Sequence, residues 1–397
     1  MIHVVGLHHP QELSPFCQSL ISQAEILVGG RRHLSCFPDH PGEKILLSSP
    51  LEKVLKRLKR EQERKIVVLT SGDPLFFGLG RLLLEHLPPE VLVFHPAPSA
   101  VQLAFSRLKL TWEDARVVSL HARSWRNLHL EIAPYRKVAF FTDPENNPSR
   151  LASYLLAKGV RGQAFVCENL GLPEEKLTTL SLEEVPQASF SSLNVMVLLK
   201  EARPRRLLFG LPEERFRHEA GLITKAEVRA AIVSALSPFP EATVWDLGAG
   251  SGAVGLELAG LAFRGETYLV ERKPERIKLI HENLHLSRLD NVKIIDADFK
   301  ECLSSLPSPD LVFIGGGWRA LRSQGEVFLG RLKPETKIAA TFVILEHLLS
   351  ALEFFEKSGF KTQFSALWLA RGQGFPEGGR GLFAQNPVFL LKAWRPR

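Results

Sequence analysis

The chain is poor in cysteine, with only four in 397 residues. Cys17, Cys36, Cys167 and Cys302 are scattered and form no Cys-x-x-Cys pair, which argues against a structural zinc site and against a disulfide framework. We therefore expect four free, buried thiols. No helical pair of histidines with a nearby acid is present either, so we predict no metal site.

Long apolar runs are also absent. No stretch approaches the roughly 20 residues that a membrane-spanning helix needs, and residues 1–6 have the pattern of a strand rather than of a signal peptide. We expect no membrane association and a cytoplasmic location. The 45% hydrophobic and 23% charged residues are ordinary for a folded protein.

A basic stripe interleaved with aromatic residues, as nucleic-acid-binding surfaces carry, is missing too. The formal net charge is nevertheless +7, because basic residues are in excess and are spread through both halves. Such a charge suits a small polyanionic substrate. We therefore expect a carboxylate-rich substrate and no nucleic acid.

The length favours two domains, and strand and helix signals alternate in both halves. Residues 201–208 are charged and contain a proline, which is typical of a linker. We predict an α/β protein with domains at 1–200 and 209–397, and a mostly parallel sheet in the second. Residues 371–381, rich in glycine, are predicted to be a long loop.

Three helix starts are indicated by N-cap residues. Ser14 precedes Pro15, and Ser99 precedes an apolar helix signal. Thr224 and Glu227 have the spacing of a capping box, in which the two side chains bond each other's backbone N–H groups.

The most informative stretch is residues 246–255, with the sequence Asp-Leu-Gly-Ala-Gly-Ser-Gly-Ala-Val-Gly. It links a strand pattern to a helix pattern, and its glycines would let backbone N–H groups approach a ligand closely. Gly250, Gly252 and Gly255 also fit the dinucleotide fingerprint. However, a carboxylate at Asp246 would repel a pyrophosphate and attract the cationic S-adenosylmethionine. We therefore favour a methyl donor over a nicotinamide.

Three acids follow the next predicted strands. Glu271 is placed to accept hydrogen bonds from ribose hydroxyls, and Asp296 and Asp298 to contact an adenine amino group, since open parallel sheets bind ligands beyond the carboxyl ends of their strands. Each acid alone could equally be a helix N-cap. A further strand ends in Gly315, Gly316 and Gly317, which suggests a flat substrate lying against backbone.

Residues 216–229, 246–255 and 313–317 together resemble the decarboxylating precorrin methyltransferases of cobalamin biosynthesis. The resemblance implies a Rossmann-like class I methyltransferase that methylates carbon 15 of a corrin precursor and removes the carboxyl group of the acetate on carbon 12. The donor would contact Thr224, Asp246, Gly248, Ala249, Gly250, Gly252, Glu271, Asp296 and Asp298. Candidates for positioning or binding the substrate are His218, Lys225, Arg229, Gly315, Gly316, Gly317 and Trp318.

The first half resembles the tetrapyrrole methylase family, in particular the subgroup acting at carbon 5. The stretches that carry the likeness are residues 26–33, 69–78, 96–102, 142–148 and 167–171. The resemblance implies two subdomains with the donor between them, contacted by Gly6, Ser71, Gly72, Asp73 and Pro74, and substrate bound by Arg31, Arg32, His33 and Ser99. One departure is that Gly6 is followed by Leu7, His8, His9 and Pro10 instead of further glycines.

We therefore predict a bifunctional methyltransferase that converts precorrin-6B, or its cobalt form, to precorrin-8. It would use one S-adenosylmethionine per domain and associate with copies of itself. Two alternatives remain. One is an RNA methyltransferase with an accessory domain, and the other is a tetrapyrrole-binding module without activity.

Overall fold

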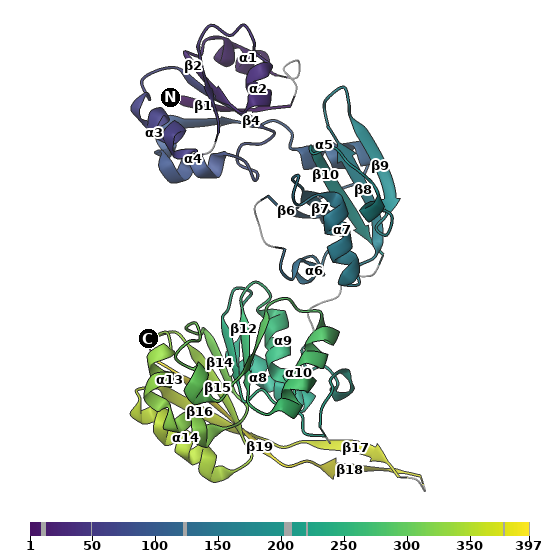
Figure 1. The fold of residues 1–397 in the computed structure, drawn as a ribbon, viewed down its shortest axis with the longest axis vertical. Coiled ribbons are helices and arrows are strands. Elements are labelled where there is room, and N and C mark those ends of the chain that lie inside the picture. Colours follow the sequence, from purple (N-terminus) through teal and green to yellow (C-terminus); the bar gives the residue numbers. More distant parts are fainter. Residues whose placement is uncertain are drawn as a thin grey trace. The chain divides into compact units, whose positions relative to one another are not determined.

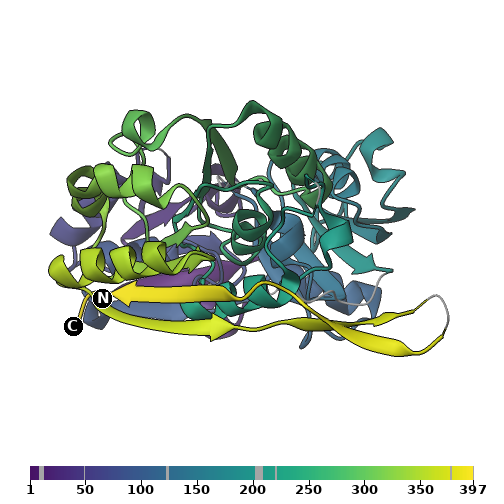
Figure 2. The same ribbon diagram turned by 90° about the horizontal axis from the view of Figure 1, so that it is seen from below.

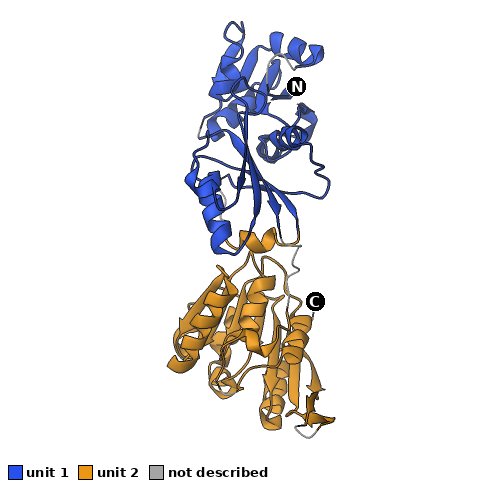
Figure 3. Cartoon of the chain, turned by 90° about the vertical axis from the view of Figure 1, so that its right-hand side faces the viewer, with its two compact units in different colours: residues 1–124, 135–204 blue, residues 125–134, 205–397 orange. Residues whose placement is uncertain are grey.

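The computed structural model describes residues 1–8, 13–48, 50–121, 125–201, 209–219, 221–375 and 378–396. His9, Pro10 and most of the predicted linker, 202–208, lie outside the described residues. The chain divides into two compact units (Figure 3): unit 1 comprises residues 1–124 and 135–204, and unit 2 comprises residues 125–134 and 205–397. The α/β class predicted from the sequence is confirmed.

Unit 1 begins with a fully parallel five-stranded sheet of order β3-β2-β4-β1-β5 (Figure 1). Its strands are β1 (Ile2–Leu7), β2 (Ile26–Gly29), β3 (Glu43–Leu46), β4 (Ile66–Ser71) and β5 (Leu92–His95). Apolar side chains of α1 (Pro15–Ser22) and α2 (Arg31–Ser35) pack on one face, and those of α3 (Glu52–Arg60) and α4 (Gly80–His86) on the other. The three buried strands, β1, β2 and β4, are largely apolar because both faces are covered.

The second sheet of unit 1 is mixed, with the order β6-β7-β10-β8-β9. It contains β6 (Arg116–Ser119), β7 (Lys137–Phe141), β8 (Gly162–Glu168), β9 (Lys176–Ser181) and β10 (Asn194–Lys200). Only β6 and β7 run parallel, since the later strands are joined by antiparallel pairings. Apolar side chains of α5 (Ala100–Leu108) pack against this sheet. The helix α7 (Pro148–Ala157) lies between β7 and β8 in the chain.

Unit 2 contains a seven-stranded sheet of order β13-β12-β11-β14-β15-β19-β16. The parallel strands are β11 (Val244–Leu247), β12 (Thr267–Glu271), β13 (Val292–Asp296), β14 (Leu311–Ile314) and β15 (Lys337–Phe342). The last strand, β19 (Val388–Trp394), runs antiparallel between β15 and β16 (Lys361–Leu367). The predicted mostly parallel sheet is therefore confirmed.

Helices cover both faces of this sheet. On one face lie α8 (Ala226–Leu236), α9 (Ala253–Leu261) and α10 (Pro274–Ser287), whose apolar side chains form two buried clusters with the sheet. On the other lie α11 (Phe299–Cys302), α12 (Trp318–Ser323), α13 (Gly325–Arg331) and α14 (Leu345–Lys357), around a core rich in phenylalanine. The short α6 (Leu128–Glu131) also belongs to unit 2.

The glycine-rich stretch predicted to be a long loop forms a β-hairpin instead. Strands β17 (Ala370–Gly374) and β18 (Arg380–Ala384) pair antiparallel, with Arg371 opposite Phe383. Figures 1 and 2 show the hairpin, in yellow, projecting beyond the sheet of unit 2. The glycines obscured the strand pattern in the sequence, because glycine weakens strand propensity without preventing pairing between neighbours.

Two of the three predicted N-caps are confirmed. The Ser14 side chain accepts from Cys17 N–H at the start of α1, and Ser99 forms a full capping box with Gln102 at the start of α5. The third is wrong, because Lys225 is the N-cap of α8 and Thr224 lies one residue before it. All four cysteines are free, as predicted, but only Cys167 and Cys302 are buried.

Candidate functional site

A cavity of about 730 Å³ opens in unit 2 where its parallel strands end. Its walls come from segments far apart in the sequence, as the ends of parallel strands converge on one edge of the sheet. They are the glycine loop 248–251, the turn 271–273, the strand end 315–317, the segment 221–225 and the residues that flank the hairpin. A cavity of this size accommodates a drug-sized ligand.

The glycine loop follows β11 and leads into α9. Gly248 has a positive φ of 74°, and a Cβ atom there would lie 2.8 Å from the carbonyl oxygen of Gly316. Only glycine therefore lets the ends of β11 and β14 approach each other. Gly248, Ala249 and Gly250 line the cavity, whereas Gly252 is the N-cap of α9 and lies outside the lining.

Asp246 lies beneath this loop and not at the cavity entrance. Its side chain is fully buried, and Oδ2 accepts a hydrogen bond of 2.9 Å from Gly255 N–H, while Oδ1 has no partner among the described residues. Burial raises the pKa of the carboxyl to about 7, and the hydrogen bond from Gly255 opposes that rise. The carboxylate that was expected to attract the donor is thus a buried acid that joins α9 to β11.

Glu271, the last residue of β12, lies in the cavity wall as predicted. Its Oε2 accepts from Gly250 N–H at 2.9 Å, and its Oε1 accepts from the N–H groups of Arg272 at 3.0 Å and Lys273 at 3.1 Å. One carboxylate therefore joins the glycine loop to the turn after β12. Each carboxylate oxygen can accept further bonds, so ribose hydroxyls remain possible partners.

The next two acids differ from each other. Asp298 lines the cavity, caps α11 and pairs with Arg272 at 3.0 Å, so the helix-cap alternative applies to it. Asp296, at the end of β13, is exposed and is not part of the cavity lining. The adenine contact expected of Asp296 therefore has no support in its position.

Gly315, Gly316 and Gly317 all line the cavity beyond β14. The following Trp318 does not. It is 4% exposed, packs against Phe342, Phe354 and Phe355, and donates from Nε1 to Ser350 Oγ at 3.1 Å. The ring is part of the core, so its position gives no support to the predicted contact with substrate, which stays a prediction.

The cations predicted to bind substrate in unit 2 lie in three different environments. Lys225 lines the cavity together with Thr224, while His218 accepts from Gly221 N–H at 3.2 Å outside the lining. Arg229 is fully buried and pairs with Glu257 at 2.9 Å, so it has no surface with which to meet a substrate.

The cavity contains cations that the sequence analysis missed, namely Arg272, Lys273 and Arg276. Arg272 and Lys273 follow Glu271 directly, and Arg276 lies in the first turn of α10. Their position after a strand end was the signal that could have identified them. Lys273 and Arg276 form no ion pair with the described residues. They add positive charge to a wall that also carries Glu219, Glu271 and Asp298.

In unit 1 the structure brings the Ser71–Pro74 loop against the end of β1. A Cβ atom on Gly6 would lie 2.0 Å from the carbonyl oxygen of Gly72, and Gly72 itself has a positive φ of 59°. The carbonyl of Gly72 also accepts from Ala97 N–H at 3.3 Å. The end of β1 and the loops that follow β4 and β5 are thus packed backbone to backbone.

Ser71 is held by the predicted substrate-binding pair. Arg32 Nη2 donates to Ser71 Oγ at 2.9 Å, and His33 Nε2 lies 3.0 Å from the same oxygen. Burial, together with the charges of Arg32 and His8, lowers the pKa of His33 to about 4. His33 is therefore neutral at physiological pH, so Arg32 and the exposed Arg31 supply the positive charge here.

The remaining predicted residues of unit 1 have structural partners. Asp73 Oδ1 accepts from Leu75 N–H at 2.8 Å, and the Pro74 carbonyl accepts from Gly80 N–H at 2.9 Å. The Ser99 hydroxyl is occupied in the capping box of α5. Asp73 and Pro74 fix the loop conformation, and their contact with a donor stays a prediction.

The described residues contain no group of three or more His, Cys, Asp or Glu side chains that could hold a metal ion. None of their helices combines the length and the apolar character that crossing a membrane requires.

Known families match both units. The profile of the tetrapyrrole (corrin/porphyrin) methylases matches residues 3–186, and that of the precorrin methyltransferase domain matches residues 214–374. A precorrin-6Y C(5,15)-methyltransferase (decarboxylating) from Sinorhizobium sp is 33% identical over 304 residues, which cover 75% of this chain and 73% of the relative.

Two shorter relatives each cover about half of the chain. A cobalt-precorrin-7 C(5)-methyltransferase from Salmonella typhimurium is 33% identical over 51% of this chain and 100% of its own length. A probable cobalt-precorrin-6B C(15)-methyltransferase (decarboxylating) from Methanothermobacter thermautotrophicus is 33% identical over 42% of this chain and 86% of its own length.

Proposed function

The chain belongs to the family of precorrin-6Y C(5,15)-methyltransferases (decarboxylating), and from that premise we propose how its two units divide the reaction. The chain is a methyltransferase of cobalamin biosynthesis whose methyl donor is S-adenosylmethionine. Unit 1 methylates carbon 5 of the corrin precursor. Unit 2 methylates carbon 15 and removes the carboxyl group of the acetate on carbon 12.

The observation that carries the proposal for unit 2 is the bond between Glu271 and the glycine loop. Glu271 Oε2 and Gly250 N lie 2.9 Å apart at the wall of a cavity of about 730 Å³. This arrangement fits an adenosyl donor, because the carboxylate can receive ribose hydroxyls and the glycine backbone can approach the donor closely. The donor would be held by Thr224, Gly248, Ala249, Gly250, Glu271 and Asp298.

For unit 1 the proposal places the donor against the loop at Ser71–Pro74, next to Gly6. The close approach of Gly6 to Gly72 supports it, because no side chain stands between these two loops. Arg31 and Arg32 would pair with carboxylates of the substrate, since a guanidinium can bind a carboxylate through two parallel hydrogen bonds. The relative from Salmonella, which is named for C(5) methylation, covers only half of this chain, as one active unit should.

The division implies one donor molecule per unit and the domain limits 1–200 and 209–397, joined by residues 201–208. The two compact units support these limits, with one exception. Residues 125–134 cluster with unit 2, although they lie within the first domain in sequence.

The chemistry requires positioning more than a protein nucleophile. S-adenosylmethionine, when bound, would supply the methyl group. As electrons of the conjugated macrocycle form the new carbon–carbon bond, the sulfur–methyl bond would break with its electron pair on sulfur, and S-adenosylhomocysteine would leave. The cavity must hold the attacking carbon about 3–3.5 Å from the methyl group. When the acetate loses carbon dioxide, the electrons of the broken bond enter the macrocycle and a proton is taken up. Gly315, Gly316 and Gly317 allow the flat ring to lie against backbone.

We also propose that the chain self-associates through the hairpin of unit 2. Leu382 is 79% exposed and Trp368, just before β17, is 76% exposed, with Phe375 and Phe383 exposed nearby. Apolar surface of this kind marks an association site. Light scattering should give a mass above that of one chain, and Leu382→Glu should lower it.

Mass spectrometry after incubation with precorrin-6B and the donor tests the proposal. The expected product carries two additional methyl groups and lacks one carbon dioxide. Donor turnover that left the tetrapyrrole unchanged would contradict it. So would calorimetry in which the intact chain bound NAD tightly and ignored S-adenosylhomocysteine.

A further inference from the structure

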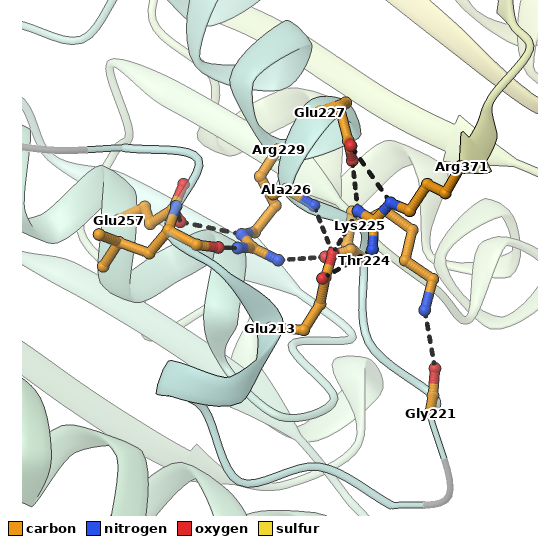
Figure 4. Close-up of polar contacts among 10 residues, drawn as sticks. Glu213, Gly221, Thr224, Lys225, Ala226, Glu227, Arg229, Glu257 and Arg371 are labelled. Atoms are coloured by element: carbon orange, nitrogen blue, oxygen red, sulfur yellow. Dashed lines mark hydrogen bonds and ion pairs between the residues drawn. The ribbon is translucent and has the colours of Figure 1, made fainter. Parts of the chain in front are cut away.

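Arg371 is the second residue of β17, and its guanidinium contacts the carboxylates of Glu213 and Glu227 (Figure 4). Nη1 and Nη2 each donate at 2.9 Å to Glu213, and Nη2 and Nε donate at 2.6 and 3.2 Å to Glu227. All three guanidinium nitrogens are therefore engaged. Glu213 is buried, and the hydrogen bonds from Arg371 hold its pKa at about 2, so the pair stays ionised at physiological pH.

Glu213 and Glu227 both act on the start of α8. Glu213 Oε1 accepts from Ala226 N–H at 2.8 Å, and Ala226 is the first residue of the helix. Glu227 lies in the first turn. The N-cap residue Lys225 provides no side-chain cap, so Glu213 supplies the acceptor from a distant segment. Negative charge is favourable here because a helix N-terminus carries partial positive charge.

The start of α8 continues directly into one wall of the cavity. Residues 221–225 line it, and they precede Ala226 without interruption. The base of the hairpin forms another wall, through Leu369, Gln385 and Asn386. Gln385 N–H donates to the Leu369 carbonyl at 2.8 Å, which joins the two ends of the hairpin. Arg371 lies two residues from Leu369, so its ion pairs connect the two walls.

A second arginine fixes the same segment from the inside. Arg229 pairs with Glu257 and donates to the carbonyls of Thr224 and Leu211, and Glu257 accepts from Gly210 and Leu211 N–H at 2.8 and 2.9 Å. This inner pair is fully buried, and removing one partner would leave an uncompensated charge. The ion pairs that Arg371 forms with Glu213 and Glu227 are instead partly accessible to solvent, since the Arg371 side chain is 32% exposed.

We propose that Arg371 is a positioning residue for the reaction of unit 2, which clasps the hairpin to the wall at 221–225 through Glu213 and Glu227. The inference rests on the proposed function, in which this cavity binds the donor. Without Arg371 the two carboxylates would repel each other, the wall carrying Thr224 and Lys225 would lose its outer support, and the reacting groups would be held less closely.

The test compares Arg371→Gln with Arg380→Gln in the full chain. Arg380 is an exposed arginine on the other strand of the same hairpin, outside the cavity lining and without an ion pair among the described residues. Both variants lose one positive charge. We expect Arg371→Gln to lower kcat/KM for carbon-15 methylation by on the order of 10²-fold, as displacement of about 1 Å can do. Arg380→Gln should stay within about twofold of the wild type, and both should retain carbon-5 methylation.

Two further variants separate positioning from stability. Arg371→Lys keeps the charge but not the planar fork, so its kcat/KM should fall between those of Arg371→Gln and the wild type. With Arg371→Ala, millimolar guanidinium should restore part of kcat well below the melting temperature. A lack of rescue combined with a lowered melting temperature would assign Arg371 to stability alone and overturn the proposal.

Equal carbon-15 activity in Arg371→Gln and Arg380→Gln would overturn it as well. A wild-type chain that made no carbon-15 product would count against the proposed function instead. Light scattering on each variant controls for a change in self-association.

Discussion

Asp246 Oδ2 accepts a hydrogen bond of 2.9 Å from the N–H group of Gly255, nine residues along the chain. This bond joins the end of β11 to the first turn of α9, below the glycine loop that lines the cavity. A Cβ atom on Gly255 would lie 2.6 Å from the same oxygen, so the carboxyl and the glycine are matched in size.

The pKa of this buried carboxyl predicts how stability depends on pH. Burial raises the pKa of Asp246 from 3.8 to about 7. Between these values the folded state binds the proton and the unfolded state does not, so this group's stabilisation is complete below about pH 4 and is lost as pH rises toward 7. The slope is at most about 1.4 kcal/mol per pH unit. Asp246→Asn should remove this dependence, as measured by urea unfolding of unit 2 from pH 5 to 8. An unchanged slope would contradict the assignment.

Loss of the Asp246 carboxylate should affect only one of the two methylations. Asp246→Ala removes the bond to Gly255 and leaves a space beneath the glycine loop, so carbon-15 methylation and carboxyl loss should be abolished. Carbon-5 methylation should continue, because unit 1 does not contain this residue. Product analysis by mass spectrometry checks both. Retained carbon-15 activity would show that the bond between Asp246 and Gly255 is not needed to hold the glycine loop.

The variant Gly6→Ala in unit 1 should have the opposite effect on the two methylations. Its Cβ would lie 2.0 Å from the Gly72 carbonyl and would force the loops apart, so carbon-5 methylation should fall by on the order of 10²-fold while carbon-15 methylation persists. Gly260→Ala is the control, because a Cβ there meets nothing within 4 Å. Equal carbon-5 activity in the two variants would show that the approach of Gly6 to Gly72 is unimportant.

Calorimetry with S-adenosylhomocysteine tests the stoichiometry. The wild-type chain should bind two molecules. Glu271→Gln loses a charged acceptor for the ribose, and hydrogen bonds to charged groups contribute about 1.5–3 kcal/mol, so one of the two sites should weaken by about 10- to 100-fold. Two sites of unchanged affinity would exclude Glu271 from the donor site.

Trp318→Ala should act on stability. The indole is buried among Phe342, Phe354 and Phe355, and truncation of a buried tryptophan costs about 3–5 kcal/mol. Denaturant unfolding of unit 2 should show this loss, with KM for the tetrapyrrole unchanged in the folded protein. A raised KM at unchanged stability would restore Trp318 to the substrate site.

Much of unit 2 could be predicted from the sequence because its signals are local. The strand before Gly248, the helix after Gly252 and the acid at Glu271 follow from hydrophobic pattern and turn chemistry, which neighbouring residues determine. The cavity residues at 315–317 follow in the same way, from their place after a strand.

The errors concern burial and hydrogen-bond partners, which depend on residues far away in sequence. Arg229 looked like a cation for substrate, but Glu257 and two carbonyls enclose it. Thr224 has the spacing of a helix cap, yet Glu213 provides the acceptor at the start of α8 from another segment. In Asp246 the residue was identified but its environment was not, since side chains on β11 alternate between the two faces and this one points toward α9.

The placement of β19 has a consequence for how the molecule is made. Residues 388–394 form an interior strand, with β15 on one side and β16 on the other, although they come last among the strands. On the ribosome, the sheet of unit 2 stays divided until this segment emerges, and at about 5–20 residues per second the earlier unit has many seconds in which to fold first. A nascent chain halted before residue 388 should therefore carry a protease-resistant unit 1 and an open, protease-sensitive unit 2.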